Sequence, residues 1–230
     1  MSGHLVFVVG PSGSGKDSLI NFVRRQMPDE LDVRFARRVI TRPMTAGAEQ
    51  HLAVSPFQFE LLREEGEFAM HWSAHGEQFG IDREIIDWLA QGAVVIVVGS
   101  RLHLPKAIEL FPDMKVVYVK ASEEIRRARL ESCLRVPNST IEARLARGSD
   151  WTVPKGIEVL ELVNEGDLPS AGRQFADMVL SLAKADAGTA APAKRTGAAP
   201  GARSARAPAE PMQRPAPRKK AAGSSPSARR

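Results

Sequence analysis

The stretch LVFVVGPSGSGKDSL, residues 5–19, limits the fold of this chain more than any other part of it. An apolar run leads into a glycine-rich loop of the form G-x-x-x-x-G-K, and apolar residues at helical spacing follow the loop up to Pro28. A strand, a tight loop and a helix in this order aim backbone N–H groups and a helix N-terminus at one point, where an anion can bind. The sequence therefore predicts a phosphate-binding loop after the first strand, with an ordinary strand-to-helix turn as the alternative.

The whole loop is expected to bind the phosphates of a nucleotide. Its residues are Gly10, Pro11, Ser12, Gly13, Ser14, Gly15, Lys16, Asp17 and Ser18. The glycines permit close approach of the backbone, and Lys16 would reach the β- and γ-phosphates. The position after the lysine, where Ser or Thr commonly holds Mg²⁺, carries Asp17. A carboxylate is a hard oxygen donor, so Asp17 could hold Mg²⁺ with Ser18 beside it; alternatively, Asp17 only complements the helix dipole.

Apolar, β-branched runs recur along the chain at intervals too long for hairpins. They lie at 5–9, 33–40, 94–98, 116–119 and 157–163. Such runs are typical of buried parallel strands. Helical patterns lie between and after them, at 56–65, 82–91, 123–132, 139–147 and 169–184. Together with the loop, this alternation predicts an α/β fold: a P-loop NTPase-type, doubly wound parallel sheet with helices on both faces.

The composition changes near residue 185. Residues 1–184 hold 22 Lys or Arg against 25 Asp or Glu, whereas residues 185–230 hold ten against two and contain no Val, Ile, Leu, Phe, Trp or Tyr. A segment without such side chains cannot bury enough apolar surface to fold. We therefore predict a folded domain with the P-loop at 1–184 and a disordered, basic tail rich in Ala, Pro and Arg at 185–230.

The positive net charge of +5 belongs to this tail, so it does not indicate a nucleic-acid groove on the folded domain. The tail could make weak, salt-sensitive contacts with RNA, acidic lipid or an acidic partner, or it could serve only as a solubilising appendage. The single Cys133 fits a reducing compartment, and the first apolar run is too short for a signal peptide or a membrane span. We expect a cytoplasmic protein with no membrane partner.

A second group of side chains is predicted to orient a phosphate acceptor. Arg42 and Arg101 each follow a predicted strand, at the carboxyl edge of the sheet where ligands of open α/β sheets bind. Arginines at this edge can neutralise an anionic acceptor. Glu49, His51 and His75 are further candidates, although a single histidine is more often an ordinary polar residue.

Several motifs, in order from about residue 4 to residue 183, resemble the ribose 1,5-bisphosphate phosphokinases, a family related to guanylate kinase. They are GPSGSGKDSL, VITRP, AGAEQHLAVS, GSRLHLPKA and VNEG. Asp after the loop lysine is the pattern of that family, whereas guanylate kinases carry Ser-Thr. Thr45 and Met70 stand where guanylate kinases carry groups that bind GMP, so GMP is not expected as the acceptor.

The resemblance implies a short lid over ATP, a requirement for Mg²⁺, and transfer of phosphate from ATP to a phosphorylated sugar. The product would be 5-phosphoribosyl 1-diphosphate, in phosphonate degradation. The attacking phosphate oxygen is already ionised near neutral pH, so no general base is needed. The implied catalytic residues are Lys16, Arg42, Arg101, Arg135 and Arg144; Arg42, Glu49, His51, His75 and Arg101 would bind the acceptor, and Asp17 and Ser18 the metal.

The segment between Leu130 and Arg144, which corresponds in length to the lid, departs from the family pattern. Where the family resembles R-G-R-E, residues 133–136 read CLRV. Arg135, Arg144 and Arg147 could cover the loss, or Arg144 and Arg147 could belong to a solvated helix face. Two alternatives to the main interpretation therefore remain: a kinase with another phosphorylated acceptor, and a nucleotide-binding module that has lost catalysis.

Overall fold

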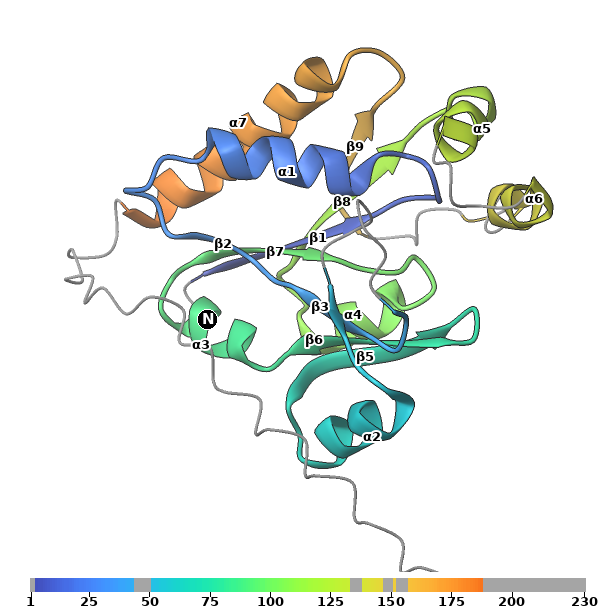
Figure 1. Ribbon diagram of the computed structural model, residues 1–230. Helices are drawn as coiled ribbons and strands as arrows, with labels where there is room; N and C mark the ends of the chain where they lie inside the picture. Colours follow the sequence, from blue (N-terminus) through green and yellow to red (C-terminus); the bar gives the residue numbers. More distant parts are fainter. Residues whose placement is uncertain (1–2, 44–50, 133–137, 147–150, 152–156, 188–230) are drawn as a thin grey trace, which may run out of the picture. The chain divides into compact units, whose positions relative to one another are not determined.

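The computed structural model describes residues 3–43, 51–132, 138–146, 151 and 157–187 (Figure 1). Five parallel strands form the central sheet, in the order β2-β7-β1-β8-β9. They are β1 (His4–Val9), β2 (Val33–Phe35), β7 (Val94–Val98), β8 (Lys115–Lys120) and β9 (Val159–Val163). The chain adds β2 and β7 on one side of β1 and then β8 and β9 on the other. This reversal opens a crevice at the carboxyl end of β1, where ligands of such sheets bind.

Helices cover both faces of this sheet (Figure 1). On one face lie α1 (Lys16–Gln26) and α7 (Leu168–Ala187), and on the other lie α3 (Glu84–Ala90) and α4 (Leu104–Leu110). Successive residues of a strand point to opposite faces. Val8 of β1 accordingly packs with Leu19 and Phe175, whereas Phe7 packs with Ile85 and Leu104. The predicted doubly wound α/β fold is confirmed.

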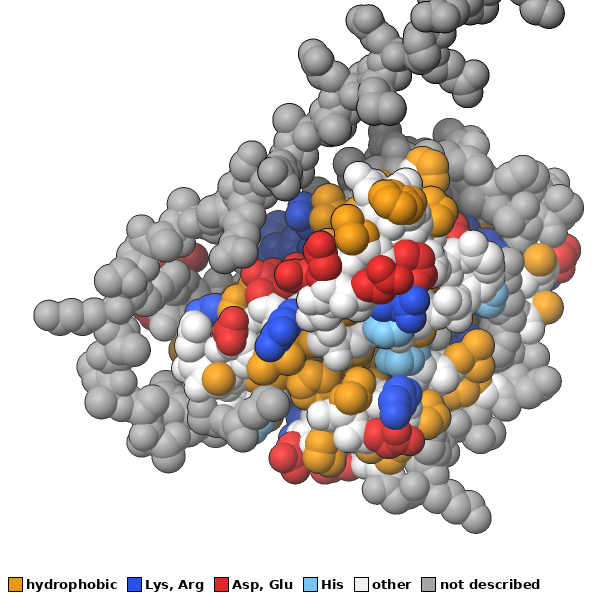
Figure 2. Space-filling model, turned by 90° about the horizontal axis from the view of Figure 1, so that it is seen from below, with side chains coloured by type: hydrophobic (Ala, Val, Ile, Leu, Met, Phe, Trp, Pro, Cys, Tyr) orange, Lys and Arg blue, Asp and Glu red, His pale blue; other side chains and the backbone are white. Residues whose placement is uncertain are grey.

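A smaller sheet, in the order β4-β3-β6-β5, lies beside the central one. Its strands are β3 (Arg38–Ile40), β4 (Leu52–Ala53), β5 (Phe68–Ala74) and β6 (Glu77–Asp82), and α2 (Pro56–Glu64) packs on it. β5 and β6 form an antiparallel hairpin whose turn residues, His75 and Gly76, both have positive φ. Figure 2 shows the molecule from below. On the part of this side that the structure describes, acidic, basic and hydrophobic side chains lie mixed together.

The prediction of one parallel strand over 33–40 is wrong. The central-sheet strand β2 ends at Phe35, and β3 begins at Arg38 in the smaller sheet, antiparallel to β6. Arg37, between them, is exposed. Arg37 can keep its charge in water because the chain leaves the central sheet at Phe35 before it enters the smaller sheet at Arg38. The predicted helices are present within a few residues, while α4 and the β5–β6 hairpin were not predicted.

The predicted lid region, residues 130–144, includes the end of α5 (Glu123–Ser132) and most of α6 (Asn138–Ala146). The two helices share a small apolar cluster of Leu130, Ile141 and Leu145. Arg127 on α5 pairs with Glu142 on α6, and this hydrogen-bonded pairing lowers the pKa of the Glu142 carboxyl.

None of the described helices combines the length and apolar composition that a membrane crossing requires.

Candidate functional site: a glycine-rich loop beside a cationic cavity

Two glycines of the loop are required by its shape. Gly13 and Gly15 have φ values of 79° and 88°, a left-handed backbone that disfavours other residues. A Cβ atom at Gly13 would lie 2.9 Å from the carbonyl oxygen of Arg126, and one at Gly15 would collide with the side-chain amide of Asn164. The loop is therefore packed closely against α5 and the end of β9.

Two side chains, those of Asn164 and Arg129, donate hydrogen bonds to the carbonyl oxygen of Ser14. Asn164 Nδ2 donates a hydrogen bond to this oxygen at 2.8 Å, and Arg129 Nη1 donates to it at 3.3 Å. The C=O and the following N–H of a trans peptide point in opposite directions. Because the Ser14 carbonyl points toward Asn164, the N–H of Gly15 points away from that side chain. A loop amide fixed in this way suits a phosphate oxygen at the helix N-terminus.

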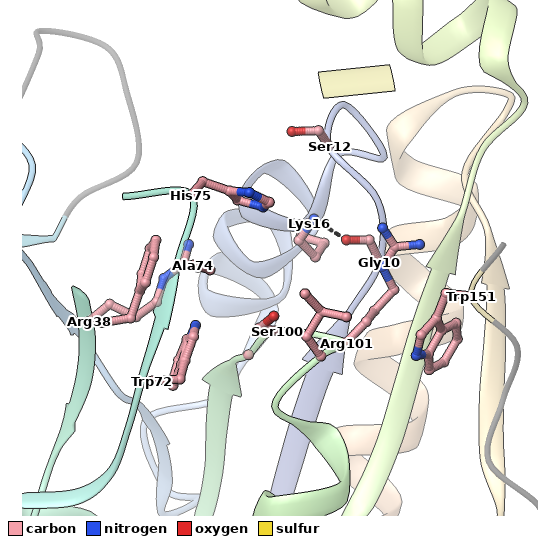
Figure 3. A pocket seen from close by; sticks show the side chains of 13 residues that line it. Gly10, Ser12, Lys16, Arg38, Trp72, Ala74, His75, Ser100, Arg101 and Trp151 are labelled. Atoms are coloured by element: carbon pink, nitrogen blue, oxygen red, sulfur yellow. Dashed lines mark hydrogen bonds between the residues drawn. The ribbon is translucent and has the colours of Figure 1, made fainter. Parts of the chain in front are cut away.

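Lys16 lies over the same loop. Its Nζ donates hydrogen bonds to the carbonyl oxygens of Gly10 and Pro11, both at 2.9 Å. Figure 3 shows the bond to Gly10. The ammonium group is only partly buried and lines a cavity next to the loop. Carbonyl oxygens are neutral acceptors, and a phosphate oxygen forms a stronger, charge-assisted hydrogen bond with an ammonium group. The lysine is thus placed to exchange these contacts for a bound anion.

The cavity, of about 290 Å³, separates the loop from the smaller sheet (Figure 3). Its described lining consists of Gly10, Ser12, Lys16, Arg38, Trp72, Ala74, His75, Phe79, Gly99, Ser100, Arg101, Leu102 and Trp151. This lining holds three cationic side chains and a histidine, with no carboxylate among its described members. Like charges repel one another in a partly buried site, so the cavity favours a ligand with several negative charges.

Aromatic rings shape the walls of the cavity. Trp72 stacks on Phe79 with ring centroids 5.5 Å apart, and His103 stacks on Trp72 from outside the lining at 5.0 Å. Burial lowers the pKa of the His103 imidazole, with smaller contributions from His71 and Lys106. The guanidinium carbon of Arg101 lies 5.8 Å from the ring centroid of Trp151, a cation–π distance that orients the arginine.

The predicted acceptor residues fall into two groups. Arg101 and His75 line the cavity. Arg42 and His51 do not: Arg42 pairs with Glu77 at 3.2 Å, and the buried His51 ring places Nε2 2.9 Å from the carbonyl oxygen of Arg42. Because a carbonyl can only accept, Nε2 of His51 carries the proton of this bond.

The lid arginines are only partly described. Arg144 lies on α6, and its Nε donates a hydrogen bond to Ser12 Oγ at 3.1 Å. This contact joins α6 to the loop, so Arg144 is not simply part of a solvated helix face. Arg135, Arg147 and the acceptor candidate Glu49 lie outside the described residues.

Asp17 has a neighbour that sequence reasoning missed. Arg38 Nη2 lies 3.6 Å from Asp17 Oδ1. Asp17 and Ser18 are both exposed in the first turn of α1. The described residues contain no group of three or more His, Cys, Asp or Glu side chains that could hold a metal. Mg²⁺ in kinases is usually held by one or two protein oxygens together with phosphates and water, so Asp17 and Ser18 fit such a site.

No family model matches the chain, but several named relatives do. The ribose 1,5-bisphosphate phosphokinase PhnN of Burkholderia mallei is 42% identical over 180 residues, which cover 78% of this chain and 97% of the relative. That of Rhizobium etli is 44% identical over 173 residues, covering 75% and 87%. The crystal structure of guanylate kinase from Anaplasma phagocytophilum matches with a TM-score of 0.57 at 16% identity, covering 79% of this chain and 87% of that one, which shows a shared fold. The chain belongs to the family of ribose 1,5-bisphosphate phosphokinases.

Proposed function

We propose that this chain transfers the γ-phosphoryl group of ATP to the 1-phosphate of ribose 1,5-bisphosphate, giving ADP and 5-phosphoribosyl 1-diphosphate. The observation that carries the proposal is the cationic lining of the cavity beside the loop lysine. An acceptor with two phosphate groups is complementary in charge to such a lining. The reaction would serve phosphonate catabolism in the cytoplasm, as the family resemblance implies.

The chemistry of this transfer agrees with the lining. An oxygen of the 1-phosphate forms the new bond to the γ-phosphorus, while the bond from that phosphorus to the β–γ bridging oxygen breaks and its electron pair leaves with ADP. A phosphate monoester has a second pKa near 6, so the attacking oxygen carries no proton at neutral pH. A kinase that phosphorylates a hydroxyl group benefits from a carboxylate base, and the described lining has none.

The loop amides and Lys16 would bind the phosphates of ATP, and Arg144 would reach them from the lid helix. Arg101 and His75 would contact the acceptor. Arg42 is held by Glu77 and would support the hairpin that carries His75. Asp17 and Ser18 would hold Mg²⁺, which neutralises charge on the phosphates when bound. Catalysis then depends on alignment and charge neutralisation of two anions.

Release of ADP with separate acceptors tests this function. Purified protein with Mg·ATP should turn over with ribose 1,5-bisphosphate and not with GMP or ribose 5-phosphate. Lys16→Ala should abolish turnover, whereas Lys106→Ala, a change at an exposed lysine on α4, should not. Turnover with GMP or with ribose 5-phosphate, and none with ribose 1,5-bisphosphate, would contradict the proposed acceptor. Binding of Mg·ATP without turnover on any of the three would indicate a nucleotide-binding module instead.

A further inference from the structure

An ion pair connects the nucleotide loop to the smaller sheet. Asp17 lies in the first turn of α1, directly after the loop lysine, and Arg38 is the first residue of β3. The atoms Asp17 Oδ1 and Arg38 Nη2 are 3.6 Å apart. Consecutive side chains of a helix point about 100° apart. Lys16 can therefore lie over the loop while the side chain of Asp17 points in a different direction, toward Arg38.

Arg38 is the more enclosed member of this pair. Its side chain is 12% exposed, against 49% for Asp17. A guanidinium group buried to this extent needs a nearby negative charge. The separation of 3.6 Å is longer than the 2.7–2.9 Å of a tight charge-assisted hydrogen bond, so the carboxylate balances the charge without a close bidentate contact. Asp17 thus contributes a negative charge that partly compensates Arg38 and favours this orientation of the guanidinium group.

Arg38 also lines the cavity, where a ligand can reach it. Figure 3 shows Arg38 and Trp72 on one side of the view, and Arg101 and Trp151 on the other, with Lys16 between them. Arg101 follows β7, which is the parallel neighbour of β1 in the central sheet. It therefore lies at the carboxyl ends of the strands, as the glycine-rich loop does. Arg38 approaches from the smaller sheet instead.

We propose that Arg38 binds the phosphate of the acceptor that does not react, the 5-phosphate, and that Asp17 is the positioning residue for Arg38. This inference rests on the proposed function, because the acceptor is the bisphosphate named there. The loop and Lys16 mark the place of the transferred group, so the 1-phosphate lies near them. The 5-phosphate extends away from the loop, toward the wall that carries Arg38. The planar guanidinium can donate two parallel hydrogen bonds to one phosphate.

Comparison of two acceptors isolates the contact with the 5-phosphate. The binding of ribose 1,5-bisphosphate and of ribose 1-phosphate is measured by calorimetry, with a magnesium complex of a non-hydrolysable ATP analogue present. Arg38→Met should weaken binding of the bisphosphate roughly 10- to 100-fold and leave the monophosphate unchanged, since hydrogen bonds to charged groups have about this strength. Arg38→Lys should give an intermediate loss. Arg37→Met, at the neighbouring exposed arginine, is the matched control and should change neither.

Equal loss for both acceptors, or no loss for either, would overturn the role of Arg38. So would failure of the unaltered protein to bind the bisphosphate. These outcomes do not depend on turnover, so an inactive protein that shows the selective loss would refute the proposed reaction and still support the contact. Thermal unfolding and affinity for the ATP analogue show whether each variant remains folded.

The role of Asp17 is tested by a double-mutant cycle. Asp17→Asn should lower the preference for the bisphosphate, and adding it to Arg38→Met should have no further effect on that preference, because a positioning residue acts through its partner. Additive losses would overturn the positioning role. A change confined to the Mg²⁺ concentration needed for nucleotide binding, with the acceptor preference intact, would also overturn it and leave Asp17 as a metal-binding residue only.

Discussion

Asn164 Nδ2 lies 2.8 Å from the carbonyl oxygen of Ser14, and this hydrogen bond joins two residues that are 150 positions apart in the chain. Both residues are buried, with exposed fractions of 2% and 0%. The backbone N–H of Asn164 also donates to the carbonyl oxygen of Lys120, at 2.9 Å, which fixes the residue to the end of β8. The shape of the glycine-rich loop therefore depends on two neighbouring strands of the central sheet.

Asn164→Ala should weaken both folding and nucleotide binding. The change removes one of two donors to a buried carbonyl group, so the free energy of unfolding should fall by about 1–3 kcal/mol. The loop would also lose a restraint on the peptide between Ser14 and Gly15, and the Kd for Mg·ATP should rise. Urea unfolding and calorimetry measure the two effects. Asn21→Ala, at an exposed position of α1, is the control and should show neither; equal effects of the two changes would contradict this role for Asn164.

Gly15→Ala should destabilise the protein for two separable reasons. Gly15 has a positive φ, and a Cβ there would also collide with the amide of Asn164. Gly66 has a φ of 71° but no atom within 4 Å of an added Cβ, so Gly66→Ala measures the backbone strain alone, about 1 kcal/mol. The loss of unfolding free energy in urea should therefore be clearly larger for Gly15→Ala. Similar losses for the two variants would show that the collision relaxes without cost.

The free energy of unfolding should depend on pH through His103. Burial lowers the pKa of this imidazole below its ordinary value of 6.5. In the unfolded chain His103 takes up a proton near pH 6.5, whereas in the folded protein it does so only at lower pH. Protons then favour the unfolded state, so stability is fully present above pH 6.5 and falls as the pH drops toward the folded pKa.

Urea unfolding between pH 8 and pH 5 measures this dependence. His103→Gln should show a smaller loss of stability over that range than the unaltered protein. The titration of the His103 ring protons in NMR spectra should give a pKa below 6.5. An NMR value at or above 6.5 would contradict the assigned effect of burial.

The sequence was sufficient for the first strand, the glycine-rich loop and the start of α1, because their signals are local. The run 5–9 and the glycines after it lie within one short segment, and they fix a strand, a turn and a helix start. The run 33–40 misled because its interruption by Arg37 and Arg38 contains neither Gly nor Pro, the usual signs that a strand ends. Tertiary packing decides where the chain passes from the central sheet to the smaller one. The pattern of apolar residues in the sequence does not indicate that position.

The supporting contacts of the site could not be predicted for a similar reason. Arg38 is separated from Asp17 by 21 positions, and Asn164 from Ser14 by 150, so no local pattern relates the members of either pair. VNEG was recognised as a motif, but its contact with the loop required the parallel pairing of β8 with β9. Strand-end position was a useful signal for Arg101, which lines the cavity, and less so for Arg42, which pairs with Glu77 outside the lining.

Arg144→Met should lower kcat without lowering stability. The side chain is partly buried on α6, and its hydrogen bond to Ser12 Oγ places a positive charge at the loop that is proposed to hold the phosphates of ATP. An arginine that stabilises charge in phosphoryl transfer contributes about 10³-fold or more to the rate. Methionine keeps much of the side-chain volume, so urea unfolding should be almost unchanged. Arg63→Met, at an exposed ion pair on α2, is the matched control and should leave kcat unchanged. An Arg144→Met variant with the kcat of the unaltered protein would assign the transition-state charge to other residues and reduce Arg144 to a contact between α6 and the loop.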